Sequence, residues 1–204
     1  MKTITPFDAI AFDMDGTLID SGPLFKFAAV EAASELGYFV SEETFLRWLN
    51  LAPQTIEAAV ISDLGTNFPF DIYRKEMIRI WEKKTENEGI PTKPGIPLLI
   101  KNLQENQVPL VVATATGRKQ AIRSLELSGL SNLTKNLVGG DEVEKPKPDP
   151  SIFVRAASIL GIPPKRCIAV EDSAVGVRAA SQADMLTILV PDLVPPDFKT
   201  VTTA

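Results

Sequence analysis

The stretch Asp8-Ala-Ile-Ala-Phe-Asp13-Met-Asp15-Gly16-Thr17, near the N-terminus, decides the fold. Its apolar run ends abruptly in carboxylates and a glycine, which is typical of a buried strand that places Asp13 at its carboxyl end. In open parallel sheets, ligands bind beyond the carboxyl ends of the strands. We therefore expect the reactive groups of this protein at the ends of its strands.

The chain on either side of residue 91 has two different patterns. Residues 21–91 contain segments with helical spacing, helix-start residues and closing glycines, without a convincing strand. Beyond residue 92, expected strands alternate with helices, which indicates βαβ units and a parallel sheet. The strands are expected at 8–13, 109–114, 136–139, 167–171 and 186–190, and the helices at 96–107, 119–128, 150–160 and 173–183.

These patterns predict an α/β fold with two domains. A Rossmann-like core with a parallel sheet is expected from residues 1–20 and 92–204. A small all-helical domain, residues 21–91, is expected to interrupt it.

The composition excludes several classes of function. With 21 Lys and Arg against 26 Asp and Glu, the net charge of -5 gives no support for binding nucleic acid. The absence of histidine excludes imidazole acid-base chemistry and zinc sites built on imidazole. The single cysteine, Cys167, fits a reducing compartment. No apolar run approaches the roughly 18 residues of a membrane span, so we expect a cytoplasmic protein that has neither a signal peptide nor a membrane partner.

Catalysis must therefore use carboxylates, hydroxyls, lysine and arginine. Such groups follow three expected strands or lie in the loop between 140 and 150, and they are Asp13, Asp15, Thr114, Thr116, Glu171, Asp172 and Lys145. Carboxylates brought together raise one another's pKa unless a cation lies among them, and oxygen ligands favour Mg²⁺. A carboxylate nucleophile can attack phosphorus while a second carboxylate transfers the proton.

The same residues carry a resemblance to a known family. Four motifs occur in order: Asp13-Met-Asp15-Gly16-Thr17-Leu18, the strand end at Thr114, Lys145-Pro146-Lys147-Pro148-Asp149, and Glu171-Asp172-Ser173 with Gly176. Together they resemble the four motifs of haloacid dehalogenase-like (HAD) hydrolases. The helical insert is similar, by position and type, to the cap of the subgroup that contains sugar phosphatases, phosphoglycolate phosphatases and β-phosphoglucomutases.

The resemblance implies a role for each matched residue. Asp13 would be the nucleophile, Asp15 the general acid and base, Thr114 a phosphoryl hydrogen-bonder, and Lys145 the anchor of nucleophile and phosphate. A Mg²⁺ ion would be held by Asp13, the backbone carbonyl of Asp15, Asp172 and Glu171. Further phosphate contacts are expected at Gly16, Thr17, Ala115 and Thr116. The implied activity is a Mg²⁺-dependent phosphatase for a small phosphorylated metabolite, such as a sugar phosphate or phosphoglycolate.

Two alternatives stay open at this stage. A phosphomutase of the β-phosphoglucomutase type is weakened because Phe25 stands where those mutases have a histidine, and because residues 49–53 lack their arginine. A non-enzymatic regulator on the same fold is disfavoured by the complete set of motifs. Arg118 and Lys119 are candidates for substrate contact at the second strand, and the candidates in the cap are Phe25, Arg47, Gln54, Arg74 and Lys75. Neither the substrate nor the oligomeric state can be read from the sequence.

Overall fold

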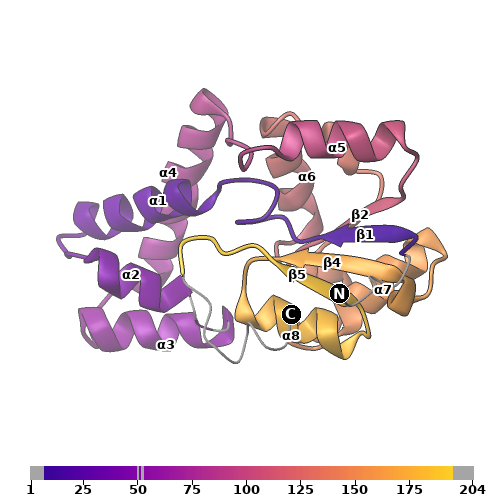
Figure 1. Cartoon of the computed structure of the whole chain (residues 1–204). Coiled ribbons are helices and arrows are strands. Elements are labelled where there is room, and N and C mark those ends of the chain that lie inside the picture. The colour runs from indigo at the N-terminus through magenta and orange to yellow at the C-terminus, as the bar shows by residue number, and fades with distance from the viewer. Residues whose placement is uncertain (1–6, 50, 52, 195–204) are drawn as a thin grey trace. The chain divides into compact units, whose positions relative to one another are not determined.

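A computed structural model describes residues 7–49, 51 and 53–194. The chain forms two units, one made of residues 1–20 and 90–204 and the other of residues 21–89 (Figure 1). The second unit ends two residues before the expected boundary at 91. Where the chain leaves and re-enters the first unit, the N–H of Asp20 donates to the carbonyl of Pro91 at 2.7 Å, and Ile19 forms an antiparallel bridge with Thr92.

The first unit is built on a parallel sheet with the strand order β3-β2-β1-β4-β5. The strands are β1 (Ala9–Phe12), β2 (Leu110–Ala113), β3 (Leu137–Val138), β4 (Cys167–Glu171) and β5 (Leu186–Leu189). Strand β1 is central and buried at all four positions, which explains its unbroken apolar sequence. The expected α/β fold with a parallel sheet is confirmed.

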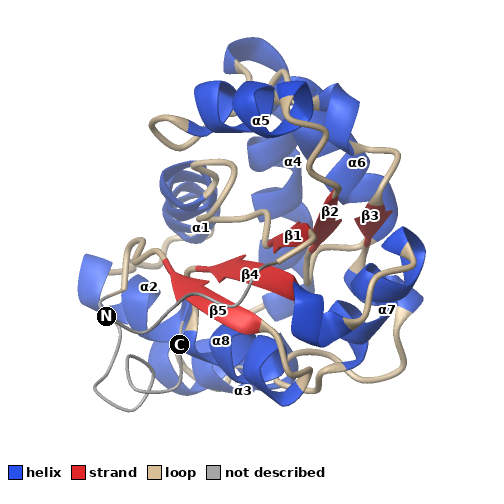
Figure 2. Ribbon diagram, turned by 45° about the vertical axis from the view of Figure 1, so that its right-hand side comes forward, coloured by secondary structure: helices blue, strands red, loops and turns tan. Residues whose placement is uncertain are grey.

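Helices cover both faces of this sheet. They are α5 (Ile96–Glu105), α6 (Arg118–Leu127), α7 (Ser151–Leu160) and α8 (Ala174–Gln182), with 3₁₀ turns η1 (Ser131–Leu133), η2 (Gly140–Glu142) and η3 (Pro164–Arg166). Figures 1 and 2 show α5 and α6 on one side of the sheet and α7 and α8 on the other. The sequence placed each of these four helices to within two residues of its observed ends.

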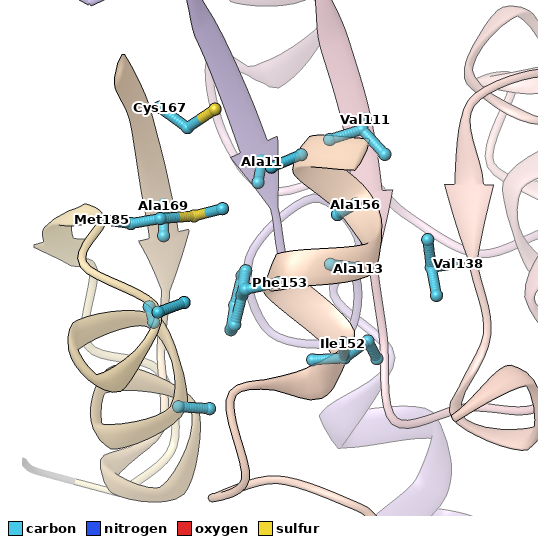
Figure 3. Packing of buried hydrophobic residues seen from close by; sticks show 14 of the residues in the cluster. Ala11, Val111, Ala113, Val138, Ile152, Phe153, Ala156, Cys167, Ala169 and Met185 are labelled. Atoms are coloured by element: carbon cyan, nitrogen blue, oxygen red, sulfur yellow. The ribbon is translucent and has the colours of Figure 1, made fainter. Parts of the chain in front are cut away.

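Small strand residues let α7 lie close to the sheet. Phe153 of α7 is fully buried in a cluster that includes Ala11 of β1, Ala113 of β2 and Ala169 of β4 (Figure 3). Because alanines leave room on the strands, the aromatic ring fills the layer between helix and sheet. The position of Phe153 fixes the start of α7, and with it the loop that precedes the helix.

The second unit contains only helices among its described residues. They are α1 (Gly22–Glu35), α2 (Glu42–Leu49), α3 (Pro53–Leu64) and α4 (Phe70–Glu88). The unit has its own core, in which alanines of α1 pack with Phe45, Trp48 and Tyr73. Within the described part of the chain, no helix has the length and hydrophobicity needed to cross a bilayer.

Candidate active site

A tight turn after β1 presents the first pair of carboxylates. The N–H of Asp13 donates to the Val170 carbonyl of β4 at 2.9 Å, so Asp13 continues the sheet, and it is only 6% exposed. The turn depends on Gly16, whose φ of +81° is costly for other residues. A Cβ on Gly16 would lie 2.2 Å from Oδ2 of Asp172, so the turn passes directly against the end of β4.

Lys147 is the lysine that reaches Asp13. Its Nζ donates to Oδ1 of Asp13 at 2.6 Å, to Oε1 of Glu171 at 2.6 Å and to the carbonyl of Ala113 at 3.0 Å. The side chain is buried, and its Nζ lies 5.0 Å from the centroid of the Phe153 ring. Lys145, which the sequence analysis expected here, is exposed instead.

The expected lysine was wrong for a physical reason. Two Lys-Pro dipeptides follow one another, at Lys145 and Lys147. They lie in a loop without hydrophobic periodicity, so no local pattern distinguishes one lysine from the other. Their spacing from α7 distinguishes them, because Phe153 is fixed in the core and Lys147 is the lysine nearer to it in the chain. The position of Phe153 in the sequence was therefore the signal that could have identified Lys147.

Glu171 is fully buried at the end of β4 and is held from several directions. Its Oε1 accepts from Lys147, and its Oε2 accepts from the N–H of Asp172 at 3.2 Å and the hydroxyl of Ser173 at 3.0 Å. A Cβ on Gly176 would lie 1.9 Å from Cδ of Glu171, so the first turn of α8 rests directly on this carboxylate. The Glu-Asp-Ser segment and the glycine after it thus form one packed arrangement.

The electrostatics of this group fit a bound cation. Asp13, Glu171 and Asp172 can each place one carboxylate oxygen within 4.8 Å of the others. Burial, followed by Glu171 and Asp192, raises the pKa of Asp172 to about 7. The pKa of Asp13 is raised well above its usual value, because burial and the neighbouring carboxylates outweigh Lys147. A hard divalent ion would lower both pKa values, and the all-oxygen set of donors suits Mg²⁺.

Lys147 remains positively charged in this environment. Burial alone would lower the pKa of its ammonium group, but the carboxylates of Asp13 and Glu171 outweigh that effect and raise it. One fixed positive charge therefore lies among three carboxylates. Because a single lysine cannot balance them, the geometry leaves a role for a metal ion beside it.

The two threonines after β2 contact the second aspartate. The hydroxyl of Thr116 donates to Oδ2 of Asp15 at 2.7 Å, and that of Thr114 approaches the same oxygen at 3.4 Å. Thr114 is buried, whereas Ala115 is exposed between the two threonines. The structure therefore brings Asp15, Thr114 and Thr116 together. The two threonines were expected to contact a phosphate, and here their hydroxyls contact the carboxylate of Asp15.

Two other phosphate-site candidates, Gly16 and Thr17, lie in the turn after β1. Thr17 is 3% exposed, and its hydroxyl has no hydrogen-bond partner among the described residues. Arg118, considered for substrate, donates to the Leu137 carbonyl at 2.6 Å and to Glu142 at 3.0 Å. Its contacts therefore hold the loop after β3, while the side chain of Lys119 is exposed.

The candidates in the helical unit are mostly at its surface. Arg47 pairs with Asp63 at 2.6 Å, and Phe25 is 40% exposed. Arg74 and Lys75 are exposed on α4. The side chain of Gln54 lies outside the described residues.

Sequence reasoning also missed Asp192, which follows β5. One of its carboxylate oxygens lies 2.9 Å from the place of a Cβ on Gly16, and its charge raises the pKa of Asp172. Lys93 donates to Asp192 at 2.6 Å and to Asp20 at 3.2 Å. Asp192 follows β5 as Asp13 and Asp172 follow β1 and β4, so its place after a strand was the signal that could have identified it.

The chain is similar to known proteins over most of its length. The family model described as haloacid dehalogenase-like hydrolase matches residues 10–190. The phosphorylated carbohydrates phosphatase of Thermotoga maritima is 29% identical over 181 residues, which cover 86% of this chain and 81% of that protein. The chloroplast protein Suppressor of Quenching 1 of Arabidopsis thaliana is 31% identical over 185 residues, which cover 89% of this chain but only 18% of that protein.

A solved structure is similar over most of the chain. The crystal structure of a CbbY variant from Rhodobacter sphaeroides, in complex with xylulose 1,5-bisphosphate, superposes with a TM-score of 0.77 and 26% identity. The match covers 92% of this chain and 87% of the other. Since the family model spans both the turn after β1 and the carboxylates after β4, the chain belongs to the haloacid dehalogenase-like hydrolases.

Proposed function

We propose that this protein is a Mg²⁺-dependent phosphatase that hydrolyses small phosphorylated metabolites through an aspartyl-phosphate on Asp13. The observation that carries the proposal is the contact between Asp13 and Lys147 in a buried group that also holds Glu171 and Asp172. A carboxylate nucleophile with a fixed ammonium beside it has what phosphoryl transfer requires, namely an attacking oxygen and a counter-charge for the phosphoryl oxygens.

In the first step, a carboxylate oxygen of Asp13 forms a bond to phosphorus while the bond from phosphorus to the leaving oxygen breaks. Asp15 gives its proton to that oxygen, so the product leaves as an alcohol. Lys147 stabilises the negative charge that develops on the phosphoryl oxygens. Thr114 is placed to donate to one of them, because its bond to Asp15 is long, at 3.4 Å.

In the second step, water attacks the phosphorus of the aspartyl-phosphate. The carboxylate of Asp15 accepts a proton from this water as the bond between phosphorus and Asp13 breaks. Inorganic phosphate leaves, and Asp13 and Asp15 regain their starting protonation states. The two steps together consume one water for each phosphate monoester.

The metal site shares the nucleophile, Asp13, with these steps and adds two carboxylates from the end of β4. Asp13, Asp172 and Glu171 would hold Mg²⁺, which supplies charge neutralisation between nucleophile and phosphoryl group when bound. Glu171 also fixes Lys147, so one buried carboxylate serves both the cation site and the lysine. The expected backbone ligand, the Asp15 carbonyl, belongs to the turn after β1 that follows Asp13.

Related proteins support the substrate class. The Thermotoga relative is named for phosphorylated carbohydrates, and the CbbY crystal holds a sugar bisphosphate. We infer a small phosphorylated metabolite of comparable size for this chain, with a sugar phosphate or phosphoglycolate as the first choices. The helical unit would contribute the residues that select among them.

The test is phosphate release from p-nitrophenyl phosphate and from a panel of sugar, glycolate and nucleoside phosphates. Turnover is expected to need Mg²⁺, to stop reversibly with EDTA, and to be abolished in Asp13→Asn. Full activity of Asp13→Asn, or full activity in EDTA, would contradict the mechanism. Isomerisation of a sugar phosphate primed by a bisphosphate, without phosphate release, would instead establish a mutase.

A further inference from the structure

The resemblance implies that the hydroxyl of Thr116, in the loop after β2, contacts the phosphate. In the structure this hydroxyl contacts Asp15 instead. The Oγ1 of Thr116 donates to Oδ2 of Asp15 at 2.7 Å, which is a normal length for a hydroxyl bonding to a carboxylate. A hydroxyl carries a single hydrogen. While Thr116 makes this bond, its side chain cannot also donate to a phosphoryl oxygen.

The backbone donor of Thr116 is also in use. Its N–H donates to Oγ1 of Thr114 at 3.1 Å, inside the same loop. The carbonyl of Thr116 accepts from the N–H of Gly140 at 3.0 Å, which ties the loop to the segment after β3. Thr116 is thus held at both backbone groups, and its β-branched side chain has few rotamers.

We propose that Thr116 is a positioning residue for Asp15 rather than a phosphate ligand. Its bond to Oδ2 fixes the rotation of the carboxyl group, so that Asp15 faces the leaving oxygen when the bond to phosphorus breaks. The inference rests on the proposed function, because it assigns to Thr116 an action on the proton transfer described above. Thr114 keeps the phosphate role, since its contact with Asp15 is long and its hydrogen can turn away from that oxygen at little loss.

The two roles predict different kinetic signatures. A phosphate ligand acts on every substrate alike, because all share the phosphoryl group. A residue that orients the general acid matters most where the leaving oxygen needs a proton, as in alkyl phosphates, and least for p-nitrophenyl phosphate. The ratio of kcat/KM for p-nitrophenyl phosphate to kcat/KM for an alkyl phosphate therefore separates them.

The experiment measures this ratio in Thr116→Val, Thr116→Ser and the wild-type protein, with an alkyl phosphate that the substrate panel shows to be turned over. We expect the ratio to rise about tenfold in Thr116→Val, which is part of the 10²- to 10⁴-fold contribution of a general acid. Thr116→Ser keeps the donor and should restore the wild-type ratio. Thr187→Val, the same change at a buried position in β5, serves as the matched control and should leave the ratio unchanged.

A double-mutant cycle tests the dependence on Asp15. Asp15→Asn should raise the ratio further than Thr116→Val, and adding Thr116→Val to it should cause no additional change. Equal losses for both substrates in Thr116→Val, or additive effects in the double variant, would overturn the inference. If Thr116→Val does not fold, as judged by thermal melting, Thr116→Ala removes the same donor with a smaller side chain and is judged by the same ratio.

Failure of the inference can be distinguished from failure of the proposed function. If the wild-type protein releases no phosphate, or if Asp13→Asn remains active, the proposed function fails. If turnover depends on Asp13 and Mg²⁺ while the ratio in the hydroxyl-free variant equals that of the wild type, only the role of Thr116 fails.

Discussion

The Nζ of Lys147 lies 2.6 Å from Oδ1 of Asp13, across 134 positions of sequence. The contact joins the loop before α7 to the end of the central strand, and Glu171 completes it from β4. Because the ammonium replaces water around two buried carboxylates, the three groups depend on one another. Lys147 therefore has consequences for both activity and stability.

Substituting this lysine should affect catalysis far more than substituting its neighbour. In Lys147→Met we expect kcat/KM for phosphate release to fall by about 100-fold or more, because the fixed charge proposed to stabilise the phosphoryl oxygens is lost. The free energy of unfolding should also fall by roughly 3 kcal/mol, since Asp13 and Glu171 lose their buried partner. Lys145→Met is the matched control and should keep activity and stability close to the wild type. Comparable losses in the two variants would contradict this assignment.

Gly176→Ala tests the packing of α8 against Glu171. Helix propensity alone predicts that alanine stabilises a helical glycine by about 1 kcal/mol. The structure instead predicts that alanine destabilises the protein. The added Cβ would lie 1.9 Å from Cδ of Glu171, which Lys147 and Ser173 hold in place by hydrogen bonds. We expect a loss of roughly 3 kcal/mol in urea unfolding. Ser181→Ala on the same helix should be neutral or slightly stabilising, and a Gly176→Ala protein as stable as the wild type would show that Glu171 moves freely.

Glu142 gives the stability of the α/β unit a dependence on pH. Burial alone raises the pKa of Glu142, but the N–H of Gly139 and the guanidinium groups of Arg118 and Arg155 outweigh it, so the net shift is downward. A carboxyl group whose pKa is lower in the folded state stabilises the fold above its unfolded pKa, and this stabilisation is lost as the pH falls. Glu142→Gln should cost about 1 kcal/mol at pH 7 and less at pH 4.

Urea unfolding at both pH values measures the effect, with the exposed Glu144→Gln as the control. A deficit for Glu142→Gln that is as large at pH 4 as at pH 7 would mean that the charge of Glu142 is not involved.

Asp63 is expected to stabilise the helical unit through two partners. Its Oδ2 accepts from Arg47 at 2.6 Å and from the indole N–H of Trp48 at 2.7 Å, and Trp48 is 4% exposed. In Asp63→Ala the buried indole N–H would lose its partner, so we expect a loss of about 1–2 kcal/mol in urea unfolding followed by circular dichroism. Glu57→Ala, exposed on the same helix, should change stability by less than about 0.5 kcal/mol. Equal effects of the two substitutions would argue against the bond to Trp48.

The sequence predicted the elements of the α/β unit well because their signals are local. The four buried residues of β1 and the helical period of α7 each depend on a few neighbouring side chains. The strand-end rule then located Asp13 and Asp172, because parallel strands end at a common edge whatever the details of the loops.

What the sequence missed depends on contacts between distant segments. Choosing Lys147 over Lys145 requires the path of a loop whose far end is fixed by Phe153 in the core. The bond from Thr116 to Asp15 depends on the rotamers of two side chains in different loops. Hydrophobic periodicity encodes neither contact, and residue spacing bears only on the lysine, through its distance in the chain from Phe153. A motif can therefore identify the chemistry of a site without showing which side chains contact one another there.

The backbone hydrogen bond between Asp20 and Pro91 has a consequence for how such proteins diverge. Because the outgoing and returning segments are hydrogen-bonded to each other, the α/β unit holds both ends of the insert side by side. A helical insert of another length or sequence needs only to begin and end at that spacing, and the strands would follow the same path. In evolution, the part proposed to select the metabolite can therefore be replaced or remodelled while the reacting carboxylates are inherited unchanged.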